Sequence, residues 1–136
     1  MAYSVDRILD ANINRAKEGL RVAEEICRFI LNNKAFTAEL KKIRHDLDGI
    51  FLGMPGFPKR FLKERESAGD VGRKISAGEL KRGSVRDIFF ANMQRVKESV
   101  RVLEEFSKLT DAGQALKFKR IRYRVYITES KIGKRL

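Results

Sequence analysis

The stretch ANINRAKEGLRVAEEICRF at residues 11–29 returns in altered form as ANMQRVKESVRVLEEFSKL at residues 91–109. The two stretches are identical at nine of nineteen aligned positions, which are Ala, Asn, Arg, Lys, Glu, Arg, Val, Glu and Glu. In both, apolar residues recur three and four positions apart, the spacing of an amphipathic helix. A second pair of segments, LKKIRHDL (40–47) and FKRIRYRV (118–125), aligns in the same order. The sequence therefore predicts two copies of a helix hairpin.

Each predicted hairpin has one apolar face that it cannot bury alone. We therefore expect an all-α, four-helix-bundle-like domain with approximate internal two-fold symmetry. The 136 residues form one predicted domain, with repeat halves at about 4–52 and 84–130. Between them, residues 53–83 hold both prolines and most of the glycines, which predicts a loop-rich insertion with short helices.

Three local signals refine the expected helices. Ser4 and Ser84 are predicted N-caps, and the second helix is expected to start near Thr37. Residues 118–128 alternate in a way that also fits a strand, but their alignment with 40–47 favours a helix.

The composition narrows the function classes. An apolar fraction of 43% with nine Phe residues is typical of a globular protein. The sequence has no run of eighteen apolar residues and no signal pattern at its start, so we expect no membrane span and a cytoplasmic location. Its one cysteine, Cys27, falls on an apolar helical face and is expected to be a buried thiol. The net charge of +12 favours partners that carry phosphate, without choosing among nucleic acid, membranes and metabolites.

A helical wheel places polar or small residues inside the apolar arc of both repeated stretches. They are Asn12, Arg15 and Gly19 in the first copy and Asn92, Arg95 and Ser99 in the second. An arginine buried without a partner is costly, which leaves two explanations. Either each arginine pairs with a carboxylate of a neighbouring helix and fixes the register of the bundle, or the Asn and Arg side chains converge on an anionic ligand for which Gly19 and Ser99 leave room.

Other residues carry weaker signals. His45 points away from the apolar stripe and is not predicted to be catalytic. Asp70 lies between two glycines in GDVG, either as a plain turn residue or as an exposed carboxylate for Mg²⁺. Glu24 and Glu104 are read mainly as solvated helix face, although both lie at the edge of the apolar arc. The common nucleotide, zinc and hydrolase motifs GxxxxGK[ST], HExxH, CxxC and GxSxG are absent.

Five segments in order along the chain carry a resemblance. RILDANINRAKEGLRVAEEICRFI, LKKIRHDL, AGDVG, ANMQRVKESVRVLEEFSKL and RYRVYITE together resemble the monofunctional hydroxymethylpyrimidine phosphate kinase domain that is often fused in front of thiamine phosphate synthase. The resemblance covers almost the whole chain and implies a standalone form without the synthase barrel. It implies transfer of the ATP γ-phosphoryl group to 4-amino-5-hydroxymethyl-2-methylpyrimidine phosphate, giving the diphosphate for thiamine biosynthesis. It further implies ATP and Mg²⁺, a functional link to thiamine phosphate synthase, and leaves a homo-oligomer open.

The chemistry of that reaction assigns candidate roles. Two polyanions must meet, and the acceptor oxygen is already largely ionised, so positioning and charge neutralisation are needed more than a strong base. The candidate catalytic residues are Arg15, Arg95 and Asp70; the candidate substrate and phosphate ligands are Asn12, Asn92, Arg44, Arg101 and Lys97; and the metal candidates are Asp70, Glu98 and Asp46. The symmetry fits a division in which one half holds ATP and the other the pyrimidine, without showing which.

Two alternatives remain at this point. A basic helical module that binds RNA or DNA is supported by the charge and by KFKRIRYR at 117–124. Tyr123 and Tyr126 would then stack on bases, whereas otherwise they pack. Such a module carries its arginines outward, so the predicted inward position of Arg15 and Arg95 counts against it. The other alternative is a non-enzymatic helical partner of a thiamine biosynthetic enzyme.

Overall fold

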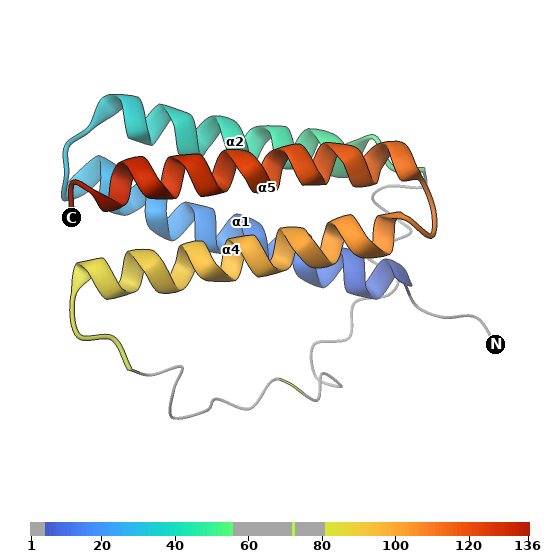
Figure 1. Ribbon diagram of the computed structural model, residues 1–136, viewed down its shortest axis with the longest axis horizontal. Helices are drawn as coiled ribbons and strands as arrows, with labels where there is room; N and C mark the ends of the chain where they lie inside the picture. Colours follow the sequence, from blue (N-terminus) through green and yellow to red (C-terminus); the bar gives the residue numbers. More distant parts are fainter. Residues whose placement is uncertain (1–4, 56–71, 73–80) are drawn as a thin grey trace.

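The computed structural model describes residues 5–55, 72 and 81–136, and the regular secondary structure in these residues is entirely α-helical (Figure 1). The helices are α1 (Val5–Phe29), α2 (Lys34–Leu52), α4 (Val85–Ser107) and α5 (Ala112–Gly133). The predicted all-α fold is confirmed. The short helices predicted for the central block, the Ser4 cap and Asp70 lie outside the described residues.

Capping side chains mark the starts of three helices. Asn33 caps α2, Ser84 caps α4 and Asp111 caps α5, each accepting a hydrogen bond from a first-turn N–H, at 2.9, 3.1 and 2.8 Å. Such bonds satisfy amides that the first turn leaves without a helical partner. The Ser84 cap was predicted and is confirmed, whereas α2 begins before Thr37 because Asn33 caps it. Residues 118–128 lie wholly within α5, so the helical alternative for them is correct.

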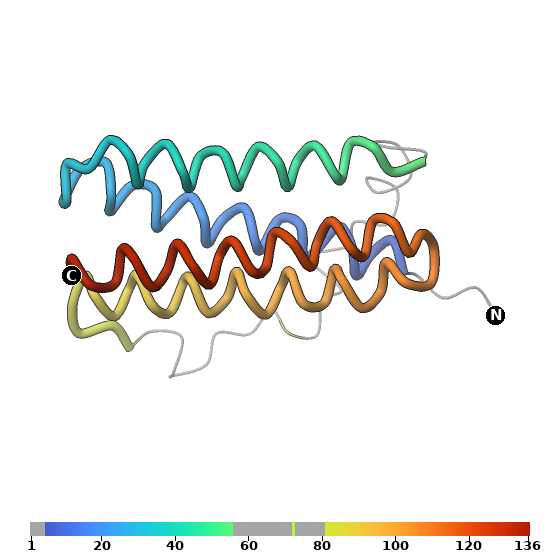
Figure 2. The backbone as a smooth tube through the Cα atoms, turned by 45° about the horizontal axis from the view of Figure 1, so that its top comes forward, coloured from blue at the N-terminus to red at the C-terminus, as the bar shows by residue number. Residues whose placement is uncertain are grey.

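Each helix packs against two neighbours, as at the four corners of a square. The contacting pairs are α1–α2, α2–α5, α5–α4 and α4–α1. Figures 1 and 2 show the two hairpins lying side by side, with α1 antiparallel to α4. The two hairpins are exchanged by a two-fold rotation. The axis of this rotation passes through the α1–α4 contact and the α2–α5 contact. This is the predicted internal symmetry.

All four helices contribute to one apolar core. Its largest fully buried side chains are Leu9, Ile13, Leu20, Leu40, Ile43, Leu47, Phe89, Met93, Leu103, Phe118 and Ile132. Equivalent positions of α2 and α5 are buried together, for example Leu40 with Phe118 and Leu47 with Val125. On the rim of the α2–α5 contact, Arg124 Nη1 lies 2.7 Å from Asp46 Oδ2. Asp46 and Arg124 occupy equivalent repeat positions, so the pair joins the two halves across the symmetry axis.

Helices α1 and α4 are in close contact at Gly19. A Cβ added there would lie 2.7 Å from Val96 Cγ2 and 2.9 Å from the main-chain oxygen of Asn92. Ser99, the counterpart of Gly19, is buried, and its hydroxyl donates to the main-chain oxygen of Arg95 at 2.7 Å. The prediction that these small residues leave room for a ligand is therefore wrong. Gly19 leaves room for the neighbouring helix.

In the described residues, no helix is both long and apolar enough to cross a membrane.

Candidate functional site

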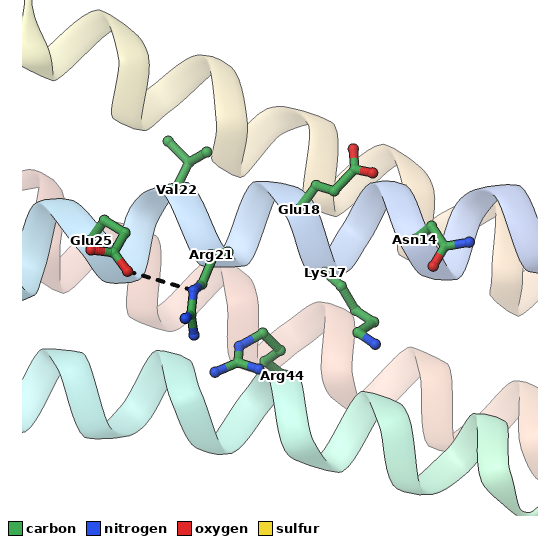
Figure 3. Close-up of a pocket in the computed structure, with 7 residues that line it drawn as sticks. All are labelled: Asn14, Lys17, Glu18, Arg21, Val22, Glu25 and Arg44. Carbon is green, nitrogen blue, oxygen red and sulfur yellow. Dashed lines mark ion pairs between the residues drawn. The ribbon is translucent and has the colours of Figure 1, made fainter.

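The bundle carries two equivalent surface grooves. The α1/α2 groove, shown in Figure 3, is lined by Asn14, Lys17, Glu18, Arg21, Val22, Glu25 and Arg44 and holds about 530 Å³. The α4/α5 groove is lined by Gln94, Lys97, Glu98, Arg101, Arg122 and Tyr126 and holds about 380 Å³. The sequence repeat relates every lining residue of the second groove except Tyr126 to a lining residue of the first. The duplication has therefore produced the same groove twice.

A buried glutamate lies beneath each groove and is held by two arginines. Glu24 and Glu104 are each only 5% exposed. Arg44 Nε lies 3.3 Å from Glu24 Oε2, and Arg122 Nε lies 2.9 Å from Glu104 Oε2. A second arginine reaches each carboxylate from one helical turn earlier. Arg21 Nη1 lies 3.5 Å from Glu24 Oε2, and Arg101 Nη1 lies 3.4 Å from Glu104 Oε1. Each hairpin thus contains the same arginine–glutamate clasp.

The clasp corrects two expectations. Glu24 and Glu104 are buried, so the solvated-face reading of them is wrong. Arginines do pair with carboxylates of a neighbouring helix, as one explanation proposed, but the pairs use Arg44 and Arg122. The hydrogen bond to Glu104 raises the pKa of Arg122 above its ordinary value, because a bonded carboxylate favours the charged guanidinium. Truncating such a carboxylate would leave a partly buried cation without a partner, so the clasp is a structural feature.

The lysines of the two grooves have different partners. Lys17 Nζ lies 2.8 Å from Asp48 Oδ1. Lys97 Nζ lies 2.8 Å from Glu129 Oε1 and 5.0 Å from the centre of the Tyr126 ring. Tyr126 stands at the repeat position that corresponds to Asp48. The grooves therefore share their arginines and differ in what surrounds the lysine.

Arg15 and Arg95 are exposed, in contrast to the prediction that they lie in the buried arc. Both asparagines of the motif donate to the main-chain oxygen four residues earlier. Asn12 Nδ2 lies 2.9 Å from the oxygen of Ile8, and Asn92 Nδ2 lies 2.8 Å from the oxygen of Ile88. Asn12 Oδ1 also accepts a hydrogen bond from Arg15 Nη1 at 3.3 Å. Asn12 is buried as expected, and Arg15 extends past it to solvent. A long side chain at the edge of an apolar arc can place its charged end in water.

The two exposed arginines lie along one seam, the outer side of the α1–α4 contact. Gly19 faces Val96, and Arg15 precedes Gly19 by one helical turn, whereas Arg95 is the residue before Val96. Because α1 and α4 are antiparallel (Figure 1), the two arginines lie on opposite sides of this contact, and Arg15 extends toward the start of α1, where its Nη1 donates to Asn12 Oδ1. In the part of the chain that the structure describes, neither forms an ion pair, unlike Arg21, Arg44 and their counterparts. They are cations available to a ligand.

The two copies of the repeat share the exposed charges at the seam but differ in their buried core residues. Buried positions differ between the copies: Ile13, Ala16, Leu20 and Ala23 become Met93, Val96, Val100 and Leu103. Exposed Arg15 and Glu18 are repeated unchanged as Arg95 and Glu98. Cores tolerate several simultaneous exchanges among apolar residues when the pattern of apolar positions is kept and the neighbours repack. Surface charge has no such packing requirement, and within the described residues neither arginine forms an ion pair, so neither packing nor ion pairing explains why both copies keep it.

The remaining predicted residues fall in different places. Arg44, Arg101 and Lys97 line the grooves but are engaged by carboxylates. Glu98 is exposed and accepts a hydrogen bond from Gln94 at 2.9 Å. Asp46 pairs with Arg124, which places it on the α2–α5 side of the bundle. Among the described residues, no group of three His, Cys, Asp or Glu side chains could hold a metal ion.

Sequence reasoning did not single out the Arg122–Glu104 pair or Arg124. The sequence did contain a signal for this pair. The alignment of LKKIRHDL with FKRIRYRV makes Arg122 the repeat equivalent of Arg44. The outward position of Arg15 and Arg95 also removes the reason given against a nucleic-acid-binding module.

Comparison with known proteins supplies the family. The model of the ThiD2 family matches residues 7–131. The chain belongs to this family. It is 43% identical over 128 residues to the thiamine-phosphate synthase of Synechocystis sp., covering 93% of this chain and 36% of that protein. It is 40% identical over 126 residues to the thiamine-phosphate synthase of Rhodopirellula baltica, covering 92% of this chain and 33% of that protein.

The ThiD2 chain therefore spans about a third of the length of the curated relatives that it matches. No solved structure matches it significantly.

Proposed function

We propose that this ThiD2 chain acts in thiamine biosynthesis, as a kinase that transfers the ATP γ-phosphoryl group to 4-amino-5-hydroxymethyl-2-methylpyrimidine phosphate. The names of its relatives support the pathway, and the sequence resemblance supports the reaction. The observation that carries the proposal is the presence of Arg15 and Arg95 at the α1–α4 seam that both halves share, where both are exposed and form no ion pair with any residue that the structure describes.

The seam suits a reaction between two phosphorylated molecules. Packed helices lie about 8–10 Å apart, so arginines from α1 and α4 can reach phosphate groups that meet between them. Each guanidinium offers a planar set of donors that matches phosphate oxygens. Because the symmetry axis passes through the seam, each half can present one substrate to the other. Arg44 and Arg122 in the grooves are less suited to binding phosphate, since Glu24 and Glu104 already neutralise their charge.

The transfer needs little covalent chemistry from the protein. An oxygen of the acceptor phosphate attacks the γ-phosphorus of ATP, and the bond from that phosphorus to the β–γ bridging oxygen breaks. ADP leaves with the bridging oxygen, and the acceptor becomes a diphosphate. The attacking oxygen is already largely ionised near neutral pH, so Arg15 and Arg95 would act by bringing the anions together and neutralising charge that develops during transfer.

Magnesium enters this proposal with the nucleotide. The described residues hold no three-carboxylate cluster, and Mg²⁺ in such enzymes is held largely by substrate phosphates and water with one or two carboxylates. Glu18 and Glu98 are exposed at the level of the seam. They are the carboxylates that would contact a phosphate-bound Mg²⁺ there, directly or through water.

The test is a coupled assay of diphosphate formation from ATP, Mg²⁺ and either hydroxymethylpyrimidine or its monophosphate. We expect turnover with the monophosphate, and a loss of about 100-fold or more in kcat/KM in Arg15→Ala and Arg95→Ala, since one charged donor to developing charge is worth about that much. Both arginines are exposed, so the thermal unfolding of the variants should stay close to that of the wild-type protein. Arg28→Ala, an exposed arginine at the far end of α1, is the matched control.

Three results would contradict the proposal. One is no diphosphate from the monophosphate under varied metals. Another is full turnover in both arginine variants. A third is salt-sensitive binding of arbitrary duplex DNA or RNA in place of turnover, which would favour the nucleic-acid-binding module.

A second candidate function is that of a non-enzymatic partner of thiamine-phosphate synthase. Its support is that relatives of this name contain the matched region as about a third of their length. In that case Arg15→Ala and Arg95→Ala should prevent assembly with the synthase, measured by analytical ultracentrifugation, and diphosphate formation should be absent from the wild-type chain.

A further inference from the structure

The two grooves differ in one aromatic side chain and in size. Tyr126 lines the α4/α5 groove, and Asp48 occupies the same repeat position beside the α1/α2 groove. The α4/α5 groove holds about 380 Å³ and the α1/α2 groove about 530 Å³. Two sites on one framework, one with an aromatic ring and one with a carboxylate, will prefer different ligands. The halves of the chain are therefore distinguishable by their chemistry.

Tyr126 is held in place while part of it remains open to the groove. Lys97 Nζ lies 5.0 Å from the ring centre, and Glu129 fixes that ammonium at 2.8 Å. The residue is nevertheless 44% exposed. A planar heteroaromatic ring gains affinity by stacking on such a surface, and stacking tolerates any ring with a π face. Lys97 and Arg101 line the same groove, each paired with a carboxylate, so the groove contributes the ring while the seam arginines receive the phosphate.

Both grooves reach the seam. Glu18 lines the α1/α2 groove and precedes Gly19, which faces Val96; Arg95 precedes Val96 and so lies at the same level. Glu98 lines the α4/α5 groove at the equivalent position. A ligand in either groove can thus extend its phosphate toward the two seam arginines. The larger volume of the α1/α2 groove favours the larger ligand there, and a nucleoside triphosphate is larger than a pyrimidine monophosphate.

We propose that the α4/α5 groove binds the pyrimidine monophosphate, with its ring on Tyr126, and that the larger α1/α2 groove binds the nucleotide. This assignment rests on the proposed function for the identity of the two ligands. It makes Tyr126 a specificity-determining residue for the acceptor, and it makes α1 and α2 the nucleotide-binding half.

The test compares Tyr126→Leu with Tyr126→Phe. Leu removes the ring, and Phe keeps the ring while removing the hydroxyl. In Tyr126→Leu we expect the KM for the pyrimidine monophosphate to rise about tenfold, the effect of losing one stacked base, while the KM for ATP stays unchanged. Tyr126→Phe should keep both constants near wild-type values. Thermal unfolding verifies that both variants fold.

A binding measurement separates this inference from the proposed reaction. Calorimetric titrations with the pyrimidine monophosphate, and separately with a non-hydrolysable ATP analogue, need no turnover. We expect Tyr126→Leu to weaken binding of the monophosphate alone, and we expect the two ligands to bind together without competing.

Each outcome has one reading. A rise in the ATP constants in place of the pyrimidine constants would reverse the assignment and overturn the inference. Unchanged constants for both ligands would show that Tyr126 is no platform, even if the kinase reaction is present. Ring-dependent binding of the monophosphate without diphosphate formation would support the groove and refute the kinase. No binding of either ligand would refute both.

Discussion

Replacing Gly19 by alanine tests the close α1–α4 contact on which the seam depends. The added methyl group would lie 2.7 Å from Val96 Cγ2 and 2.9 Å from the main-chain oxygen of Asn92. Both distances are shorter than a carbon atom tolerates, and the second atom belongs to a helix backbone that cannot turn aside. The helices must therefore move apart. Gly49→Ala is the matched control, because α2 leaves nothing within 4 Å of the new Cβ.

The two substitutions should change stability in opposite directions. Alanine is favoured over glycine in a helix by about 0.5–1 kcal/mol, a gain that both variants share. In Gly49→Ala this is the whole effect. In Gly19→Ala it is set against overpacking, which costs about 1–3 kcal/mol. The difference between the variants is thus about 1–3 kcal/mol in the free energy of unfolding, or several degrees in Tm for a chain of this size.

Urea unfolding followed by circular dichroism measures both free energies. We expect Gly49→Ala to unfold at a higher urea concentration than the wild-type chain and Gly19→Ala at a lower one, with similar slopes. If Gly19→Ala is stabilised as much as Gly49→Ala, the helices are not in tight contact at this point. The placement of Arg15 and Arg95 beside this contact would then lose its basis.

Two further predictions concern buried titratable groups. Glu104→Gln should lower the free energy of unfolding by about 2–4 kcal/mol, because Arg122 loses its charged partner. The control Glu105→Gln changes a more exposed carboxylate and should alter this free energy little. Equal effects of the two substitutions in urea unfolding would contradict the clasp. Burial, with a smaller contribution from Glu24, raises the pKa of Cys27 to about 11. An unfolded thiol ionises near pH 8.5, so from about pH 9 to 11 the unfolded chain loses this proton first and stability falls. Cys27→Ser should show a shallower loss over that range; identical slopes would refute the burial effect.

Periodicity and the internal repeat predicted the architecture because they record local geometry. Residues 118–128 alone fit a strand, and their alignment with 40–47 gave the helix that α5 confirms. Helix starts were less well predicted, since Asn33 and Asp111 act as caps only in the backbone conformation of their turns. The central block, with Asp70, stays a prediction because it lies outside the described residues.

The sequence by itself determined that two equivalent hairpins must pack together and that each carries the same asparagine, arginines and glutamates. Only the tertiary structure decided which of those charges are buried. A helical wheel gives the direction in which a side chain leaves its helix, but burial depends on the neighbouring helix and on the length of the side chain. Glu24 is covered because α2 brings Arg44 over it, whereas Arg15 starts at the edge of the α1–α4 contact and extends beyond it into solvent.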